Sequence, residues 1–441
     1  MSTPVQHQEK TGSTMTPERA YGEAMKFENR PNPYPFFDEM RKTPVTLMSN
    51  GICVVTGFSE IMTLGHDPRV SSDMRKGPLA AAIRGDAKSN GNVPKASAET
   101  IDKYGKDPSM IVMDPPEHDR TRRQAMRHFG PPHSPHVIPD MEPYCVRVVN
   151  DLLDKVKGKT QIDVVDDYAY PLPVAVICKV LGVPFKDEAR FHAWVAEFFA
   201  GIDLGPEGAT EEAQVRKQKA MAAGAELKKY VIGLIQSAEK NPPSDGMISR
   251  LVHDNGPDGR MSDSEIVNNT QLLLIAGHDS TVNTIAHCVL TLLRNPGAFD
   301  MVRRQPDLIP RAIEEVLRLE SAVQFFPTRT ALEDIDIDGT TIPKGSPIFL
   351  MYGAGNRDPR HFENPNKFDL ERKERDSLGW GVGIHTCFGG PLARLEVNVA
   401  LETFLRRVKN PRLVVDPPPY RPNQIFRGPI HLLIDFDGMS D

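Results

Sequence analysis

The chain has 441 residues, of which 39% are hydrophobic and 25% charged, and its formal net charge at pH 7 is −6. This composition is typical of a globular protein with a large core, and the acidic balance argues against a general nucleic-acid binder. The five cysteines are scattered without a CxxC pair, which excludes a zinc knuckle or iron–sulfur site of that kind and favours a reducing cytoplasm.

The polar N-terminus and the lengths of the apolar runs indicate how the chain is organised. Residues 1–27 are polar and lack the apolar run of a signal peptide, so we expect a disordered N-terminal arm there. No apolar run reaches the roughly 18 residues that span a bilayer, so we expect no membrane anchor. No low-complexity linker divides residues 28–441, and we expect them to form a single domain.

In chain order, residues 45–67 predict a short hairpin followed by a helix. Residues 79–110 are irregular, and a stretch of that length predicts a lid or binding loop. From about residue 117 to 320, apolar residues recur at helical spacing. Strand signals return near residue 329, with a turn at Asp338-Gly339. The sequence therefore predicts a mostly α protein of the α+β class, with small hairpins beside a helical body.

A long central helix is predicted between Ser262 and Pro296. Ser262 and Glu265 form a capping box, and the absence of proline until Pro296 predicts one helix of about 30 residues. Gly277 and Asp279 interrupt its apolar middle, where glycine costs roughly 1 kcal/mol relative to alanine. Two interpretations stay open from this helix alone: a functional site, or a helix distorted by a Ser or Thr hydroxyl while Asp279 reaches solvent.

The segment "GWGVGIHTCFGGPLARLE", residues 379–396, places Cys387 among five glycines just ahead of a predicted helix. Glycine lets another group come close to the main chain. Backbone N–H groups and a helix N-terminus favour the thiolate, which is the form of cysteine that binds metals or acts as a nucleophile. The alternative is a buried structural cysteine.

Three segments together resemble the cytochrome P-450 family: the cysteine loop, "AGHDST" at 276–281 and "EEVLR" at 314–318. Their order and spacing match from about residue 28 to the C-terminus. The resemblance implies the cytochrome P-450 fold, with heme b (iron protoporphyrin IX) between the central helix and the cysteine loop. It also implies that Cys387 is the axial thiolate, which pushes electron density onto the iron and favours O–O cleavage.

The resemblance implies further roles around the heme. Glu315, Arg318 and Arg372 are expected to form a structural triad, although an ordinary surface ion pair is the alternative for the first two. Trp380 stands where the family most often has phenylalanine, so its indole N–H needs a partner. The expected propionate contacts are His118, Arg122, Arg329 and His385, and the other expected cofactor contacts are Ala276, Gly277, Trp380, Gly381 and Gly389.

The implied activity is that of a monooxygenase, which activates O₂ and hydroxylates or epoxidises an apolar small molecule. Fatty acids, terpenoids, steroids and polyketides are the candidate substrates, with fatty acids preferred. Asp279 and Ser280 are expected to deliver protons, with Thr281 as a neighbouring hydroxyl. Ser280 replaces the usual threonine, so control of water near the oxygen is expected to be looser. The expected substrate contacts are Leu274, Val323, Phe325 and Phe326.

Partners and competing functions follow from the same resemblance. Electrons are expected from a ferredoxin and its reductase, and the protein is expected to be a cytoplasmic monomer. Arg120, Arg123, Arg127 and Arg394 form either a basic docking face for an acidic carrier or a solvated helix surface. A peroxide-driven heme-thiolate oxygenase and a heme-based sensor or carrier without turnover remain as alternatives.

Overall fold

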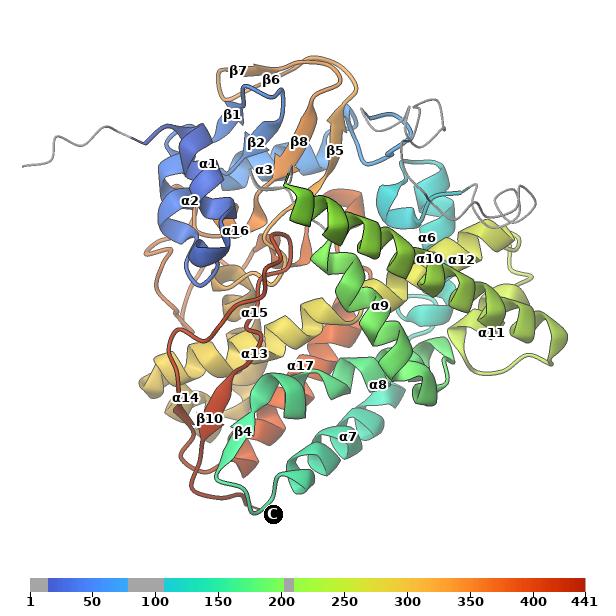
Figure 1. Cartoon of the computed structure of the whole chain (residues 1–441), viewed down its shortest axis with the longest axis vertical. Helices are drawn as coiled ribbons and strands as arrows, with labels where there is room; N and C mark the ends of the chain where they lie inside the picture. The colour runs from blue at the N-terminus through green and yellow to red at the C-terminus, as the bar shows by residue number, and fades with distance from the viewer. Residues whose placement is uncertain (1–14, 78–106, 202–209, 441) are drawn as a thin grey trace, which may run out of the picture.

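The computed structural model describes residues 15–77, 107–201 and 210–440. These residues form a mostly helical body with small sheets, as the sequence predicts (Figure 1). The helices are α1 (Pro17–Met25), α2 (Tyr34–Arg41), α3 (Phe58–His66), α6 (Glu117–Phe129), α7 (Glu142–Lys155), α8 (Pro171–Leu181), α9 (Glu188–Ala200), α10 (Glu211–Lys240), α11 (Met247–Val252), α12 (Asp263–Ala276), α13 (Asp279–Arg294), α14 (Pro296–Arg304), α15 (Ile309–Leu319), α16 (Tyr352–Gly355) and α17 (Gly390–Arg407). The strands are β1 (Val45–Leu47), β2 (Cys53–Val55), β3 (Val70–Ser71), β4 (Gln161–Asp163), β5 (Phe326–Ala331), β6 (Ile335–Ile337), β7 (Thr340–Ile342), β8 (Pro347–Leu350), β9 (Arg412–Leu413) and β10 (Leu433–Asp435).

Helix α13 lies at the centre of the body and packs against α15 and α17 (Figure 1). Almost every residue of α13 up to Leu292 is buried, on all sides of the helix. A helix that is buried on all sides must be enclosed by other elements. The largest apolar core therefore surrounds α13 and joins it to α7, α8, α15 and α17.

The main sheet joins segments that are far apart in the sequence. Its strand order is β1-β2-β8-β5-β3, with β1 antiparallel to β2 and β2 parallel to β8. The predicted turns form: Gly51 has a φ of 82° between β1 and β2, and Asp338 and Gly339 have positive φ values between β6 and β7. The parallel pair was not predicted, because no local pattern reports which distant strand lies beside β2.

The polar N-terminal arm predicted over residues 1–27 is wrong for residues 17–25, which form helix α1. Thr16 caps this helix by accepting a hydrogen bond from the N–H of Arg19, and Pro17 suits its first turn. Ala20 and Ala24 are fully buried because α1 packs on α2. Residues 1–14 lie outside the described part of the chain.

The single central helix predicted from about residue 262 to 295 is also wrong, because the structure contains two helices, α12 and α13. Between them His278 has the non-helical angles φ −102° and ψ −87°. The predicted capping box at Ser262 and Glu265 starts α12. Glycine is a poor helix former, and the Ser280 hydroxyl donates to the carbonyl of Ala276 at 3.0 Å. The helix therefore breaks at the polar segment that the sequence had marked.

The predicted lid, residues 79–110, falls almost entirely outside the described residues, since only residues 107–110 belong to them. Met110 begins a short 3₁₀ turn that ends at Val112. Among the described residues, none of the helices combines the length and the apolarity that crossing a membrane requires.

Candidate functional site

The cysteine loop is a closed turn that presents Cys387 just ahead of α17. The N–H of Cys387 donates to the carbonyl of Trp380 at 2.7 Å. Gly381 and Gly383 have φ values of 76° and 69°, and a Cβ on Gly383 would lie 2.0 Å from the carbonyl oxygen of Gly65 in α3. Only glycine permits this approach. Gly383 thus lets the loop lie against α3, so the group that comes close to this glycine is the backbone of another helix.

Cys387 is the one cysteine whose side chain is exposed, and it is exposed to an internal cavity. Protein surrounds the sulfur on its other sides, and this burial raises the pKa of the thiol. The N–H groups of Gly389 and Gly390 and the guanidinium of Arg122 act in the opposite direction, because they stabilise the thiolate. The other four cysteines are buried. Among the five cysteines, Cys387 alone is therefore placed to bind a metal in the cavity.

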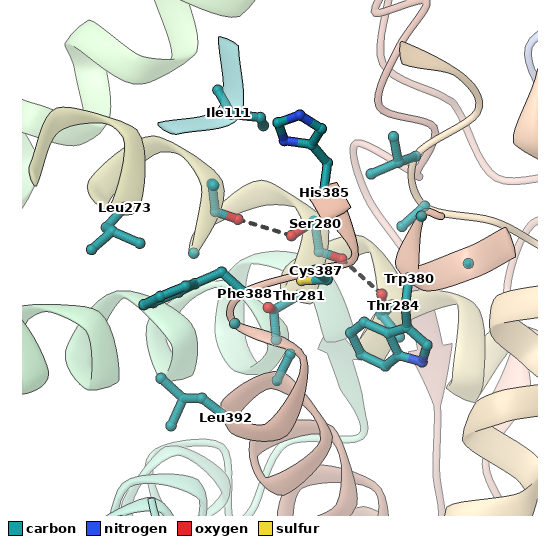
Figure 2. Close-up of a pocket in the computed structure, with 18 of the residues that line it drawn as sticks. Ile111, Leu273, Ser280, Thr281, Thr284, Trp380, His385, Cys387, Phe388 and Leu392 are labelled. Carbon is teal, nitrogen blue, oxygen red and sulfur yellow. Dashed lines mark hydrogen bonds between the residues drawn. The ribbon is translucent and has the colours of Figure 1, made fainter. Parts of the chain in front are cut away.

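The cavity lies between the cysteine loop and the N-terminal half of α13. Figure 2 shows Ser280, Thr281 and Thr284 from α13 together with Cys387 and Phe388 from the loop. Most of the wall is apolar, and its apolar side chains include Ile111, Leu272, Leu273, Ala276, Val323, Phe326, Leu392 and Phe426. An apolar cavity with a few well-placed polar groups is typical of sites for cofactors and small ligands.

A cluster of cationic and imidazole side chains gathers around His385. The rings of His118 and His385 are 4.6 Å apart, and the Nε2 atoms of both are buried without a hydrogen-bond partner among the described residues. Arg329 is 5% exposed, and it lines the cavity with Arg122. Burial, followed by the charges of Arg329 and His118, lowers the pKa of His385 to about 3. Unpartnered buried donors and positive charge fit the two carboxylates of a heme, so the residues present suit this cofactor.

The break between α12 and α13 places a hydroxyl on the cavity wall and a carboxylate behind it. Ser280 lines the cavity, and Thr284 donates to its carbonyl at 2.8 Å (Figure 2). Asp279 does not line the cavity; its side chain is 9% exposed and accepts a hydrogen bond from Arg421 at 3.0 Å. Sequence reasoning missed Arg421, which lies in an irregular segment 142 residues from its partner. The aspartate is therefore ion-paired, and solvent is not its main contact.

Ala276, Gly277 and Gly389, which were predicted as cofactor contacts, all line the cavity. A Cβ on Gly277 would lie 3.2 Å from Ile177 of α8, so the glycine lets the helix break sit close to that helix. A Cβ on Gly389 would meet no atom within 4 Å, because this residue faces the open cavity. Gly277 thus serves helix packing as well as the cavity wall.

Two of the predicted substrate contacts lie in the core instead of on the cavity wall. Leu274 is fully buried in the main core, while its neighbour Leu273 lines the cavity. Phe325 is also fully buried and stacks on Phe349, with ring centroids 5.7 Å apart. Successive side chains point about 100° apart on a helix and to opposite faces on a strand. The prediction named the neighbour of the correct residue in both cases: Leu273 and Phe326 line the cavity, whereas Leu274 and Phe325 lie in the core.

Val323 and Phe326 do lie on the cavity wall. Met110, the last residue of the predicted lid or binding loop, also lines the cavity. Other wall residues that the sequence did not suggest come from distant segments: Ile111 before α6, Tyr352 in α16 and Phe426 near the C-terminus. Each is an ordinary apolar or aromatic residue in a short or irregular element. No local pattern distinguishes such a residue from one that fills the core.

The indole N–H of Trp380, which is expected from the sequence to need a partner, donates a hydrogen bond to Glu314. Its Nε1 donates to Oε2 of Glu314 at 2.9 Å, and Arg394 donates to the other oxygen of Glu314 at 2.6 Å. The Arg394 guanidinium also lies 4.3 Å from the centroid of the Trp380 ring. The three side chains hold one another beside the cysteine loop. The indole N–H therefore points to Glu314 and away from the sulfur of Cys387.

Glu315 binds two arginines in a buried cluster. Its carboxylate accepts from Nε of Arg318 at 2.8 Å and from Nε of Arg372 at 3.0 Å. Both guanidinium groups also donate to backbone carbonyls between Asn356 and Lys367. The cluster thereby joins α15 to the segment that leads into the cysteine loop. An exposed surface pair, the alternative raised by the sequence, does not describe this arrangement.

The four arginines predicted as a basic docking face each have an acidic partner on the same chain. The partners are Glu265 for Arg120, Asp258 for Arg123, Asp254 and Asp258 for Arg127, and Glu314 for Arg394. The first three arginines tie α6 to α12 and to the loop that precedes it. Since these charges are neutralised in pairs, the structure favours the interpretation of a helix surface over a basic docking face.

Comparison with known proteins agrees with this geometry. Residues 58–432 match the family model described as Cytochrome P450. The biotin biosynthesis cytochrome P450 of Bacillus subtilis is 34% identical over 92% of this chain and 96% of its own. The 6-deoxyerythronolide B hydroxylase of Saccharopolyspora erythraea is 32% identical, with 92% and 96% covered. P450BioI, solved in complex with hexadec-9Z-enoic acid ligated acyl carrier protein, has a TM-score of 0.79 at 33% identity, with 93% of this chain and 99% of that chain covered.

These matches extend over most of the chain and include relatives named as hydroxylases. They agree with the mostly helical fold and with the cavity that Cys387 faces. The chain belongs to the cytochrome P450 family, whose members carry a heme iron, and it is a cytochrome P450 monooxygenase.

Proposed function

We propose that this monooxygenase holds heme b with Cys387 as the iron ligand and inserts one oxygen atom from O₂ into an apolar small molecule. The observation that carries the proposal is the position of Cys387, whose side chain faces an apolar cavity with Ser280 on the wall formed by α13. When bound, the heme supplies the oxygen-activating chemistry, and the protein supplies position, charge and exclusion of water. A ferredoxin and its reductase are the proposed electron donors.

The residues around His385 would hold the cofactor by its carboxylates. Arg329 would contribute a charge-assisted hydrogen bond, and the Nε2 atoms of His118 and His385 would gain the partner that they lack. Arg122 donates to the carbonyl of Thr386 at 2.7 Å, so it holds the cysteine loop beside this cluster. Trp380, fixed by Glu314, would pack beside the thiolate without donating to it.

Asp279 and Ser280 would deliver the protons that oxygen activation consumes. The Ser280 hydroxyl lies on the cavity wall, and the Asp279 carboxylate lies one residue away on the outer side. A rotation of the Asp279 side chain away from Arg421 would bring the carboxylate toward the hydroxyl. Thr281 also lines the cavity and offers a second hydroxyl. This arrangement supports use of O₂ and reductant over the peroxide-driven alternative, which needs no proton delivery.

Asp279→Asn is expected to slow turnover by roughly 10²-fold, the lower end of what positioned proton transfer contributes. Heme content and substrate binding should not change, because the amide keeps the shape of the carboxylate. Ser280→Ala should still consume reductant but should release more hydrogen peroxide and less product. The measurement is product formed per reductant consumed, with peroxide assayed alongside.

Asp300→Asn is the matched control, since Asp300 is an exposed aspartate on α14. The Asp279→Asn, Ser280→Ala double variant tests whether these two residues deliver protons. Unchanged turnover and unchanged product yield in that variant would remove proton delivery from these residues and would support the peroxide-driven alternative.

The apolar wall of the cavity sets the proposed substrate class. Polyketides and fatty acyl chains are both represented among relatives, in the 6-deoxyerythronolide B hydroxylase and in the P450BioI complex. We expect fatty acids to give the largest shift of the heme absorption in a screen that also includes terpenoids, steroids and polyketides. Val323→Asp should weaken every such shift, because it places a charge on the apolar wall.

If only polar compounds shift the heme absorption, the proposal of an apolar substrate is wrong. A shift that is never followed by substrate-dependent consumption of reductant would support the sensor or carrier alternative.

A further inference from the structure

A pair of histidines lies behind Asp279, on the side away from the cavity. His278 is fully buried at the break between α12 and α13. Its Nε2 lies 3.3 Å from Nδ1 of His192 on α9, and the two rings stack with planes 11° apart. The same Nε2 lies 4.0 Å from Oδ1 of Asp279. The polar side chains therefore continue outward from Asp279 to α9, where His192 is half-buried.

Charged and polar groups face this pair from several elements. The Tyr170 ring packs 4.4 Å from His192 and 5.0 Å from His278, and its hydroxyl donates to Glu188 at the start of α9. The other charged groups that face the pair are Asp279 from α13, Arg421 from the C-terminal segment and Asp166 from the π-helical turn at Val164–Ala169. Burial is the main influence: it lowers the pKa of His192 and lowers that of His278 to about 4. Both rings are thus neutral near pH 7, and each has one N–H and one acceptor nitrogen.

Asp279 needs a proton source on its outer side. Each proton that it passes inward must be replaced, and the carboxylate faces away from the cavity. Its hydrogen-bond partner, Arg421, cannot supply the proton because a guanidinium does not deprotonate in proteins. A neutral imidazole can relay a proton, because its free nitrogen accepts one and its N–H gives one up. The competing source is water that reaches the exposed edge of Asp279 directly.

We propose that His192 and His278 form a proton-supply route that reprotonates Asp279. The proposal rests on the proton role proposed above for Asp279. His192 takes a proton from solvent at Nε2 and gives its Nδ1 proton to Nε2 of His278. His278 then gives that proton to Oδ1 of Asp279 and returns to its neutral form. His192 regains its starting tautomer by exchange with solvent: with the ring turned so that Nδ1 meets water, Nδ1 takes up one proton and Nε2 releases one, and the ring then turns back. One proton enters, one proton leaves, and no electron moves.

The first test observes the pair without turnover. In ¹⁵N-histidine-labelled protein, as the diamagnetic ferrous carbon monoxide complex, two ring nitrogens should show the shifts of one N–H···N hydrogen bond. His192→Gln should abolish this signal at His278. Two rings that titrate independently, each as a free imidazole does, would overturn the proposal.

The second test separates proton supply from structure. His192→Gln and His278→Gln should each slow turnover with O₂ and reductant about tenfold, less than the roughly 10²–10⁴-fold of a full acid–base contribution, because water can partly replace the route. The solvent deuterium isotope effect on kcat should rise. Turnover driven by added hydrogen peroxide should not change, since peroxide brings its own protons. His133→Gln, at an exposed histidine, is the control.

The possible results distinguish a structural role of the histidines, direct supply of protons by water, and failure of the proton role of Asp279. If both variants lose turnover with O₂ and reductant and turnover with hydrogen peroxide to the same extent, the histidines have a structural role and the proposal is wrong. If neither variant changes while Asp279→Asn is slow, water feeds Asp279 directly and only the histidine route fails. If Asp279→Asn also leaves turnover unchanged, the proposed proton role of Asp279 itself is wrong.

Discussion

Glu315→Ala should lower the free energy of unfolding by about 3–5 kcal/mol, the range measured when one partner of a buried ion pair is removed. The substitution leaves the guanidinium groups of Arg318 and Arg372 buried without their shared carboxylate. It also loosens the segment between Asn356 and Lys367, whose carbonyls these arginines hold. We therefore expect both a lower melting temperature and little heme-containing protein on purification.

Glu371→Ala is the matched control, because Glu371 is exposed and directly precedes Arg372 in the chain. This variant should have the same melting temperature as the wild type. Glu315→Gln separates charge from shape, since the amide fills the same space but does not neutralise the two arginines. Melting and heme content equal to wild type in both Glu315 variants would show that the cluster adds nothing to stability.

Cys387→Ala should abolish turnover with O₂ and reductant while the protein still folds. The side chain faces the cavity and fills no part of the apolar core, so its loss removes no core packing. The cationic cluster around His385 remains to bind the cofactor carboxylates, and some heme should be retained. Ile384→Ala is the control, because Ile384 is an exposed residue of the same loop. Turnover by Cys387→Ala above background would mean that another group serves as the ligand.

Local chemistry explains which parts of the fold the sequence predicted. Helical periodicity located α7 to α10, and the turn signal Asp338-Gly339 located the β6–β7 hairpin. The glycine pattern around Cys387 marked the loop because glycines are placed where backbones approach closely. In the structure, Gly383 meets the backbone of α3, which a single sequence does not reveal.

Several other features escaped prediction for a different reason, because they depend on contacts between distant residues. Arg421 pairs with Asp279, and Glu314 pairs with Trp380, although no local pattern in the sequence reports either pairing. The histidine pair brings α9 to the helix break in the same way. The break itself was visible in the sequence as an anomaly, yet whether the helix would bend or end there depends on packing against α8.

The central claim is that the sulfur of Cys387 binds the heme iron, and the most direct test is the absorption of the reduced protein with carbon monoxide. We expect the strongly red-shifted band of a thiolate-ligated heme in the wild type and in Ile384→Ala, and its loss in Cys387→Ala. A wild-type spectrum typical of an imidazole-ligated heme, or an unchanged band in Cys387→Ala, would contradict the account.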